Sequence, residues 1–478
     1  MRNQKQPAVG AIFSAVALLG LAGCGGGGGG TAAAAPTLVA VAAAEAATAA
    51  ATTPDLSAAS TPTATAVPTT EVPTAQPTSA TAPPPTPTPA SATTAVLTAQ
   101  APAPTGATVS SAQAVAAGPA VQAVASAAAA SGSAPQLGSC EMFPATAVFN
   151  TRIDDTSRFP AHTRSTAWIE SVGTGTRFQP DWWMGDDPTR RDAYYGIPVN
   201  LVDGTPATTD WPVVSHDFAA SGVSMDQGYP HESDCAVAEG GGFGIARSCT
   251  TVAPTQRRFP FPLAGNVKNE GGQCNDPATC GDHHVLVVEQ GACRLWESFA
   301  AYRLSNQWYA MSTAAWDLSS LALRPNTWTS GDAAGLPMTP FLAKAAEASA
   351  GEIRHALRVT FQASVLSRDF VWPARHAAGG SAPDGIPFGS VLRLKPDFAI
   401  PDNWTTQAKA IATAAKRYGM YVSDVGMNLY VQGEPGAGWD EETFRQLKAI
   451  PITSMEFVDM GNITADPRFS RDSMAGSW

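Results

Sequence analysis

Acidic and imidazole side chains gather around two neighbouring segments of strand-like sequence. Gly-Asp-His-His at 281–284 leads into Val-Leu-Val-Val-Glu, and the next segment contains Leu-Trp-Glu-Ser at 295–298. If the segments pair as strands, Asp282 or His284 at the end of one approaches Glu297 within the other. Two carboxylates about 5 Å apart, or about 6.5–9.5 Å apart, are the usual equipment for cleaving a glycosidic bond. We predict Asp282, Glu297 and His284 as catalytic; alternatively, Glu297 faces solvent on a strand and Asp282 forms a turn.

A second group of basic residues follows later in the chain. His355 and Arg358 stand three positions apart, so on one strand they face opposite sides unless a bulge intervenes. Arg375 and His376 follow Trp372, and His376 and Trp372 share one face of an extended chain. An arginine that neutralises a uronate, with a histidine as base, is the equipment of a polysaccharide lyase. We predict His355, Arg358, Arg375 and His376 as substrate-binding residues; the alternative is that each histidine forms structural hydrogen bonds.

A metal site is a further alternative for these residues. Asp282, His284 and His376 combine carboxylate and imidazole groups that suit several divalent ions. Their spacing specifies no particular metal, so we predict neither a metal nor another cofactor.

Aromatic residues are dense between 181 and 195. Asp-Trp-Trp at 181–183 and Tyr-Tyr at 194–195 flank two further aspartates, and Trp308, Trp316 and Trp328 come later. Exposed tryptophan and tyrosine rings combine an apolar face with a polar edge, as a sugar ring does. We predict that Trp182 and Trp183 contact a glycan; core packing is the alternative for each ring.

The elements that must position these residues are mostly strands. Segments of strand length and pattern lie between Gly, Pro, Asn and Asp residues. They are 147–151, 197–202, 284–289, 294–301, 356–361, 391–394, 420–422 and 429–431. The four residues 290–293 suit a hairpin turn between the third and fourth of them.

Two helices are predicted late in the chain. One runs from about Thr405 to Tyr418, where Gly419 can end it in the left-handed conformation. The other begins after Asp440 as its cap and stops at Pro451. Strands followed by helices predict a mainly β fold: a β-sandwich or jelly-roll-like body with a small α+β C-terminal portion, after a disordered stalk.

Several enzyme classes are disfavoured by missing motifs. The domain contains no GxxxxGK[ST], GxGxxG, GxSxG or HExxH sequence, and the glycine-rich stretch 239–244 lacks the lysine of a phosphate loop. Nucleotide hydrolases, dinucleotide enzymes, α/β-hydrolases and zincin proteases are therefore disfavoured.

Six of the seven cysteines form an even set after residue 136. They are Cys140, Cys235, Cys249, Cys274, Cys280 and Cys293. Six cysteines permit 15 pairings. Proximity in the sequence favours Cys235 with Cys249 and Cys274 with Cys280, which leaves Cys140 with Cys293. A metal site is the alternative, although no spacing among them is CxxC.

The first 24 residues have a charged start, a short apolar run and Leu-Ala-Gly-Cys at 21–24. This segment resembles a bacterial lipoprotein signal. The resemblance implies that Cys24 is lipidated, that residues 1–23 are removed, and that a membrane anchor holds the chain in the cell envelope. Gly25 in place of an aspartate implies the outer membrane or the cell surface.

Residues 24–135 form the predicted stalk. From Gly25 to Gln136 the sequence is mostly Ala, Thr, Pro, Ser and Gly, with three acidic residues and no aromatic one. Such a composition buries too little apolar surface to offset an ordering cost of about 1–2 kcal/mol per residue. We expect a β-rich portion at 136–400, an α+β portion of the same module at 401–464 and a tail at 465–478.

The net charge and the predicted location together limit the classes of partner that the protein could bind. The formal charge of the whole chain is −11, which makes nucleic acid an unsuitable partner. Export, stalk, aromatic density and polar strand ends predict a surface lipoprotein that acts on polysaccharide by glycoside hydrolysis, or as a lyase variant. A non-catalytic glycan-binding or adhesive protein and an envelope structural protein are the alternatives.

Overall fold

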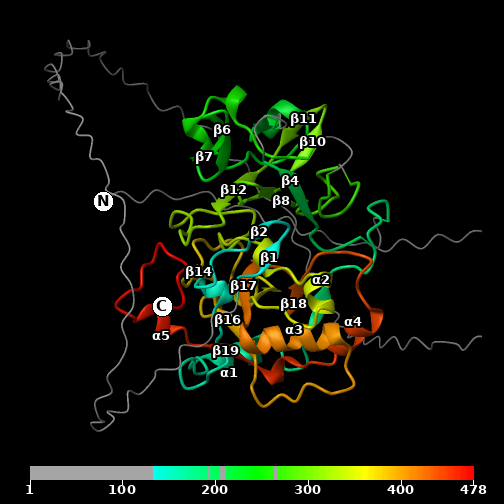
Figure 1. Cartoon of the computed structure of the whole chain (residues 1–478), viewed down its shortest axis with the longest axis vertical. Helices are drawn as coiled ribbons and strands as arrows, with labels where there is room; N and C mark the ends of the chain where they lie inside the picture. The colour runs from blue at the N-terminus through cyan, green and yellow to red at the C-terminus, as the bar shows by residue number, and fades with distance from the viewer. Residues whose placement is uncertain (1–132, 191–193, 205–210, 263–266, 275) are drawn as a thin grey trace, which may run out of the picture. The chain divides into compact units, whose positions relative to one another are not determined.

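The computed structural model describes residues 133–478, apart from 191–193, 205–210, 263–266 and 275 (Figure 1). Cys24, the predicted signal and all but the last three residues of the predicted stalk lie outside the described residues. Strand residues outnumber helical ones, 27% against 17%, in several sheets with few helices. The prediction of a mainly β fold is therefore confirmed. No helix in the described ranges is long and apolar enough to cross a bilayer.

The larger sheet has six strands in the order β19-β16-β17-β13-β18-β3. They are β3 (Gln179–Asp181), β13 (Leu357–Phe361), β16 (Val391–Leu394), β17 (Met420–Val425), β18 (Tyr430–Gln432) and β19 (Met455–Val458). The neighbours β13 and β17 run parallel, with a register shift between Val359 and Thr360. Three of the strands precede residue 401 and three follow it, so the predicted β-rich and α+β portions share this sheet.

The helices lie mainly against this sheet. They are α1 (Ser165–Val172), α2 (Ala345–Ser349), α3 (Thr406–Arg417), α4 (Glu441–Leu447) and α5 (Gly461–Thr464). Helix α3 contacts β16, α2 and α4, as Figure 1 shows for its orange ribbon. Thr405 caps α3 by accepting a hydrogen bond from the Ala408 N–H, and Asp440 caps α4 in the same way. Both late helices that the sequence predicts are confirmed.

The second sheet has four strands in the order β12-β9-β8-β4. They are β4 (Val199–Asp203), β8 (Val285–Gln290), β9 (Arg294–Phe299) and β12 (Ser312–Asp317). Strands β8 and β9 form the predicted hairpin, with Leu286 opposite Glu297. Strand β4 pairs with β8 in parallel. The parallel pairs in both sheets bring together segments far apart in the sequence.

Four smaller groups of strands complete the fold. They are β1 (Gln136–Leu137) with β2 (Cys140–Glu141), β5 (Val214–Ser215) with β10 (Tyr302–Leu304) and β11 (Gln307–Tyr309), β6 (Asp234–Glu239) with β7 (Gly242–Arg247), and β14 (Leu366–Phe370) with β15 (Ile386–Phe388).

One hydrophobic core joins the two larger sheets. Leu286 and Leu295 of the four-stranded sheet pack in the same cluster as Val359 and Val422 of the six-stranded sheet. The opposite face of β8 and β9 packs in a second cluster that contains Trp296, Trp211 and Phe259. Because β8 and β9 are buried on both faces, any polar side chain on them needs a partner inside the protein.

Three disulfides join the paired cysteines that sequence proximity favours. The bonds are Cys140–Cys293, Cys235–Cys249 and Cys274–Cys280. The first connects the start of the described chain to the turn between β8 and β9.

Two features differ from the sequence analysis. Residues 147–151, predicted as a strand, form a 3-10 turn at Val148–Asn150; the prediction is wrong because the Thr151 N–H bonds locally to the Val148 carbonyl. The tail after residue 465 has no sequence pattern, yet Met474 is buried and its N–H donates to the Leu321 carbonyl.

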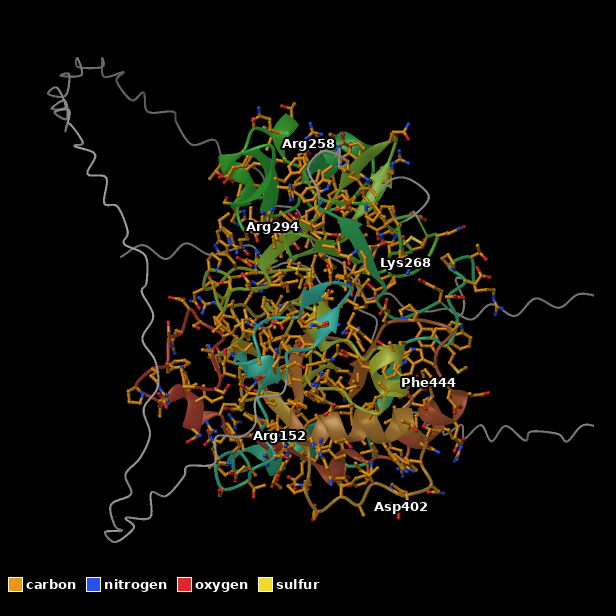
Figure 2. All side chains as sticks on the ribbon, in the orientation of Figure 1. Arg152, Arg258, Lys268, Arg294, Asp402 and Phe444 are labelled. Carbon is orange, nitrogen blue, oxygen red and sulfur yellow. A yellow bond between two sulfur atoms is a disulfide. The ribbon has the colours of Figure 1, made fainter. Side chains whose placement is uncertain are left out.

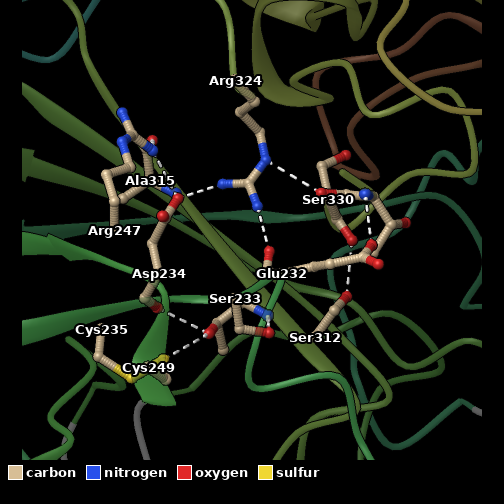
Figure 3. Close-up of polar contacts among 12 residues, drawn as sticks. Glu232, Ser233, Asp234, Cys235, Arg247, Cys249, Ser312, Ala315, Arg324 and Ser330 are labelled. Carbon is tan, nitrogen blue, oxygen red and sulfur yellow. Dashed lines mark hydrogen bonds and ion pairs between the residues drawn. A yellow bond between two sulfur atoms is a disulfide. The ribbon is translucent and has the colours of Figure 1, made fainter. Parts of the chain in front are cut away.

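A buried ionic network attaches the β6–β7 hairpin to β12 (Figure 3). Arg324 pairs with Asp234, which also accepts hydrogen bonds from Arg247 (2.6 Å) and from the Ala315 N–H (2.8 Å). Arg324 also donates to the Glu232 carbonyl at 2.5 Å. The network thereby fixes the start of the long segment between β12 and β13.

Candidate active site

Residues 330–339, which we call the central segment, receive many of the polar side chains that sequence analysis selects. The segment has no regular strand, and all but one of its residues are buried. His284, which directly precedes β8, and Arg358 of β13 both contact this segment. The predicted residues therefore do converge, but on a buried stretch of chain rather than on an open surface.

Glu297 binds the C-terminal end of the central segment. Its carboxylate accepts hydrogen bonds from the Met338 N–H, the Thr339 N–H and the Thr339 hydroxyl, each at 2.8 Å. The side chain is fully buried, and burial raises its pKa to about 7 despite these donors. Since a substrate cannot reach it, the geometry does not support the predicted catalytic role; nor does Glu297 face solvent, as the alternative expected.

His284 connects the central segment to Glu270. Its Nε2 lies 2.8 Å from the Gly331 carbonyl oxygen and its Nδ1 lies 2.6 Å from Glu270 Oε2. Burial alone would lower the pKa of His284, but the adjacent Glu270 carboxylate outweighs it and raises the pKa to about 9. Burial in turn would raise the pKa of Glu270, and the charge of His284 outweighs it, so that carboxyl stays ionised. The Glu270 side chain is 23% exposed.

The loop that carries Glu270 is attached to the four-stranded sheet. The Asn200 side chain in β4 donates to the Lys268 carbonyl at 2.7 Å and accepts from the Lys268 N–H at 2.8 Å. Figure 2 labels Lys268 beside this strand. The Glu270 N–H then donates to the His284 carbonyl at 3.0 Å. These bonds fix the backbone on both sides of Glu270.

Arg358 is the buried cation of the candidate site. Its guanidinium donates two hydrogen bonds to Asp332, at 3.2 and 3.0 Å, and one to Asp424 at 2.8 Å. Arg358 and Asp332 are buried, whereas the Asp424 side chain is 18% exposed. Burial raises the pKa of Asp424, and the charge of Asp332 adds to that effect. Two acidic side chains thus already accept hydrogen bonds from the arginine that was predicted to bind substrate.

Asp282 lies at the solvent side of this arrangement. The residue is exposed, and within the described ranges its carboxylate accepts no hydrogen bond. Surrounding protein still desolvates the carboxyl and raises its pKa, an effect that the charge of His284 reduces. Asp282 is therefore the predicted catalytic residue that remains accessible.

Asp181, at the end of β3, adds a second accessible acid. It stands opposite Gln432 of β18. Burial raises the pKa of Asp181 to about 6, the charge of Glu270 adds to the shift, and a hydrogen bond from Gln432 reduces it. Sequence analysis did not select Asp181, Glu270, Asp332 or Asp424 as site residues. Of these four, only Asp181 has a feature in the sequence that could have identified it, because it directly precedes the Trp182–Trp183 pair.

The tryptophan pair splits between core and surface. Trp182 is fully buried, with its ring centroid 5.0 Å from that of Trp439. Trp183 points the other way, as successive residues of an extended chain do, and its ring lies 5.7 Å from that of Tyr195. Tyr195 is 41% exposed. Partial burial is the largest cause that raises the pKa of Tyr195, and the charge of Asp181 adds to it. Trp182 therefore packs in the core, as its alternative expected, and the glycan contact of Trp183 stays a prediction.

The other predicted substrate-binding residues have structural partners. His355 is buried between the Ala356 carbonyl (2.8 Å) and Glu347 (3.1 Å). Arg375 donates to the Arg471 carbonyl and to Asp472, each at 2.6 Å, and so holds the tail. His376 is half-buried and its Nδ1 lies 2.9 Å from the Ala333 carbonyl oxygen of the central segment. In the described ranges, none of the three forms a hydrogen bond with the carboxylates around Glu270, so their predicted role gains no support.

In the part of the chain that the structure describes, no three His, Cys, Asp or Glu side chains are arranged to hold a metal ion. No protein-family model, curated protein or solved structure matches the chain.

Proposed function

We propose that this chain hydrolyses glycosidic bonds in a polysaccharide, with Asp181 as proton donor and Glu270 as the ionised carboxylate. The observation that carries the proposal is that the pKa of Asp181 is raised and that of Glu270 is lowered, with Asp181 close enough to affect the exposed ring of Tyr195. Burial raises the pKa of Asp181 and the charge of Glu270 adds to that shift, while the charge of Asp181 adds to the raised pKa of Tyr195; we infer from these interactions that the three groups belong to one site. Environments that separate the pKa values of two neighbouring carboxyls assign acid and base roles.

The reaction needs one proton donor and one ionised carboxylate. Asp181, with a pKa of about 6, would give its proton to the glycosidic oxygen as the bond to the anomeric carbon breaks. Glu270 would either attack that carbon or take a proton from the attacking water. In both courses water is consumed, and its oxygen ends on the new reducing end. Asp282, which is exposed and whose carboxylate accepts no hydrogen bond in the described ranges, would contact the substrate next to them.

Hydrolysis is favoured over elimination by the state of Arg358. A lyase needs a cation that neutralises a uronate, but Arg358 is buried and already bound by Asp332 and Asp424. The accessible groups around Glu270 are acidic, so they would repel an anionic glycan. We therefore expect a neutral polysaccharide, with Trp183 and Tyr195 as its stacking surface.

The location follows from the lipoprotein resemblance of residues 1–24. We propose that Cys24 is lipidated and that the chain is anchored in the cell envelope, at the outer membrane or cell surface. The three disulfides are compatible with an oxidising compartment.

The test uses the purified, oxidised full chain and a panel of neutral and acidic polysaccharides, with reducing-end release as the assay. Glu270→Gln and Asp181→Asn should each lower the turnover of a neutral substrate by at least about 100-fold, the scale of general acid–base catalysis. Glu352→Gln is the matched control, because Glu352 is 59% exposed and its ion pair with Arg354 is 3.9 Å long. Full activity in Glu270→Gln would exclude the assignment.

A non-catalytic glycan-binding protein is the second candidate, and the contact of the half-buried Trp183 with the exposed Tyr195 favours it. It predicts saturable binding to a polysaccharide in the same panel, with no released fragment from any member.

A further inference from the structure

Both ring nitrogens of His284 are occupied by fixed partners. A carbonyl oxygen can only accept, so the 2.8 Å contact with Gly331 requires a proton on Nε2. Glu270 Oε2 lies 2.6 Å from Nδ1 and also faces the His284 backbone N–H at 3.4 Å. One carboxylate oxygen that faces two nitrogens of the same residue suits an ionised acceptor and a ring protonated on both sides.

The charged groups around the pair come from several elements. Asp282 acts on His284 from the residues just before it, Arg358 from β13 and Asp424 from β17, and Asp332 of the central segment acts on Asp282 and Asp424. Asp181 faces Glu270 from β3. Glu270 and Asp282 favour a positive charge on the buried ring of His284, and together they outweigh the opposing effects of burial and Arg358.

The other oxygen of Glu270 is left for a ligand. Among the described residues, Oε1 takes part in no hydrogen bond, and the side chain is 23% exposed whereas that of His284 is 3% exposed. His284 thus contacts Glu270 inside the protein, and of the two side chains only Glu270 is partly accessible to solvent.

We propose that His284 is a positioning residue: it remains an imidazolium that ties Glu270 to the Gly331 carbonyl and presents Glu270 Oε1 to the substrate in ionised form. This inference rests on the proposed function for the role of Glu270, but the protonation and contacts of His284 do not depend on any substrate. His284 therefore exchanges no proton with the substrate and is not a catalytic residue.

The chain contains a matched control in His355. Its ring is equally buried and also lies between a backbone carbonyl and a glutamate, Glu347. That pair lies beside α2 and does not touch Glu270. A substitution of His355 therefore reproduces the loss of a buried, bonded imidazole without altering the candidate site.

The first experiment measures ring protonation by nitrogen NMR on the full chain with labelled histidine. The chain has seven histidines, and the signals of His284 are assigned by their absence in His284→Gln. We expect both ring nitrogens of His284 to carry protons at neutral pH, and one of them to lose its proton in Glu270→Gln. A neutral His284 ring in the unsubstituted protein would overturn the proposal, whether or not a substrate is known.

The second experiment measures the pH dependence of kcat/KM on the polysaccharide that the panel identifies. Loss of an adjacent cation raises a carboxyl pKa by about 1–3 units, so the acidic limb should move upward by that amount in His284→Gln, with little change in KM. His355→Gln should keep the original limb. An unshifted limb in folded His284→Gln would overturn the positioning role. Absence of turnover in the unsubstituted chain would instead remove the proposed function and leave the NMR result standing.

Discussion

Replacing Arg358 by methionine should destabilise the protein strongly. The guanidinium is 1% exposed and supplies two hydrogen bonds to Asp332, whose side chain has no exposure. Removing one partner of a buried ion pair leaves an uncompensated charge and costs about 3–5 kcal/mol. Asp424 loses a 2.8 Å hydrogen bond in the same step. We therefore expect Arg358→Met to lower the free energy of unfolding by about 4 kcal/mol.

The double variant Arg358→Met, Asp332→Asn tests the cause of this loss. Because the asparagine carries no charge, the double variant should lose less stability than the sum of the two single variants. Arg354→Met serves as the surface control, since Arg354 is 39% exposed and pairs with Glu352 at 3.9 Å. Such an exposed pair contributes less than about 1 kcal/mol.

The assay is equilibrium unfolding in urea, followed by tryptophan fluorescence and circular dichroism on the oxidised full chain. The free energies come from linear extrapolation, provided that the two probes coincide. The reasoning is refuted if Arg358→Met loses no more stability than Arg354→Met, or if the losses of the two single variants simply add.

Three other outcomes follow. The pKa of Glu297 is about 7 in the folded chain, against an ordinary value of 4.5. Protonated Glu297 therefore adds to the free energy of unfolding; this contribution is fully present below about pH 4.5 and is lost as pH rises through 7. Relative to Glu297→Gln, the unsubstituted protein should lose on the order of 3 kcal/mol of unfolding free energy between about pH 4.5 and 8 in urea titrations; a constant difference would contradict this. Trp183→Ala with Tyr195→Ala should weaken glycan binding by about tenfold in calorimetry, whereas unchanged affinity would remove the stacking surface. Cys24→Ser should abolish fatty-acid labelling and release the chain from the membrane fraction; continued labelling would contradict lipidation at Cys24.

The strands were largely predictable because most of them are short apolar segments between turn residues. The β8–β9 hairpin, β13, β16 and the capped helix α3 all lie within a few residues of their predicted positions. Residues 147–151 show the limit of the method, because a short apolar stretch with strand propensity also suits a 3-10 turn that the tail covers.

The candidate site was predictable in part. Asp282 and His284 were found because they stand at the end of a recognisable strand. Glu270 was not, because it stands 14 positions before His284 and the described residues between them form no helix or strand, so periodicity gives no contact. Asp332 was missed for the same reason, since the central segment has no repeating pattern and is held by side chains distant in the sequence, among them Arg358 and His284.

Glu297 illustrates how a sequence pattern can identify an important residue and mistake its role. Its place on a strand between apolar neighbours indicates an unusual carboxylate. Whether that carboxylate faces a substrate or a backbone depends on the central segment, which packs against β9 from more than 30 positions later.

The most direct test of the central claim is mass spectrometry of polysaccharide fragments formed by the full chain in water enriched in heavy oxygen. Hydrolysis through Asp181 and Glu270 predicts fragments from a neutral polysaccharide with one heavy oxygen at each new reducing end, and their loss in Glu270→Gln. Unsaturated fragments without added water would contradict hydrolysis, and the absence of fragments from every substrate would contradict catalysis.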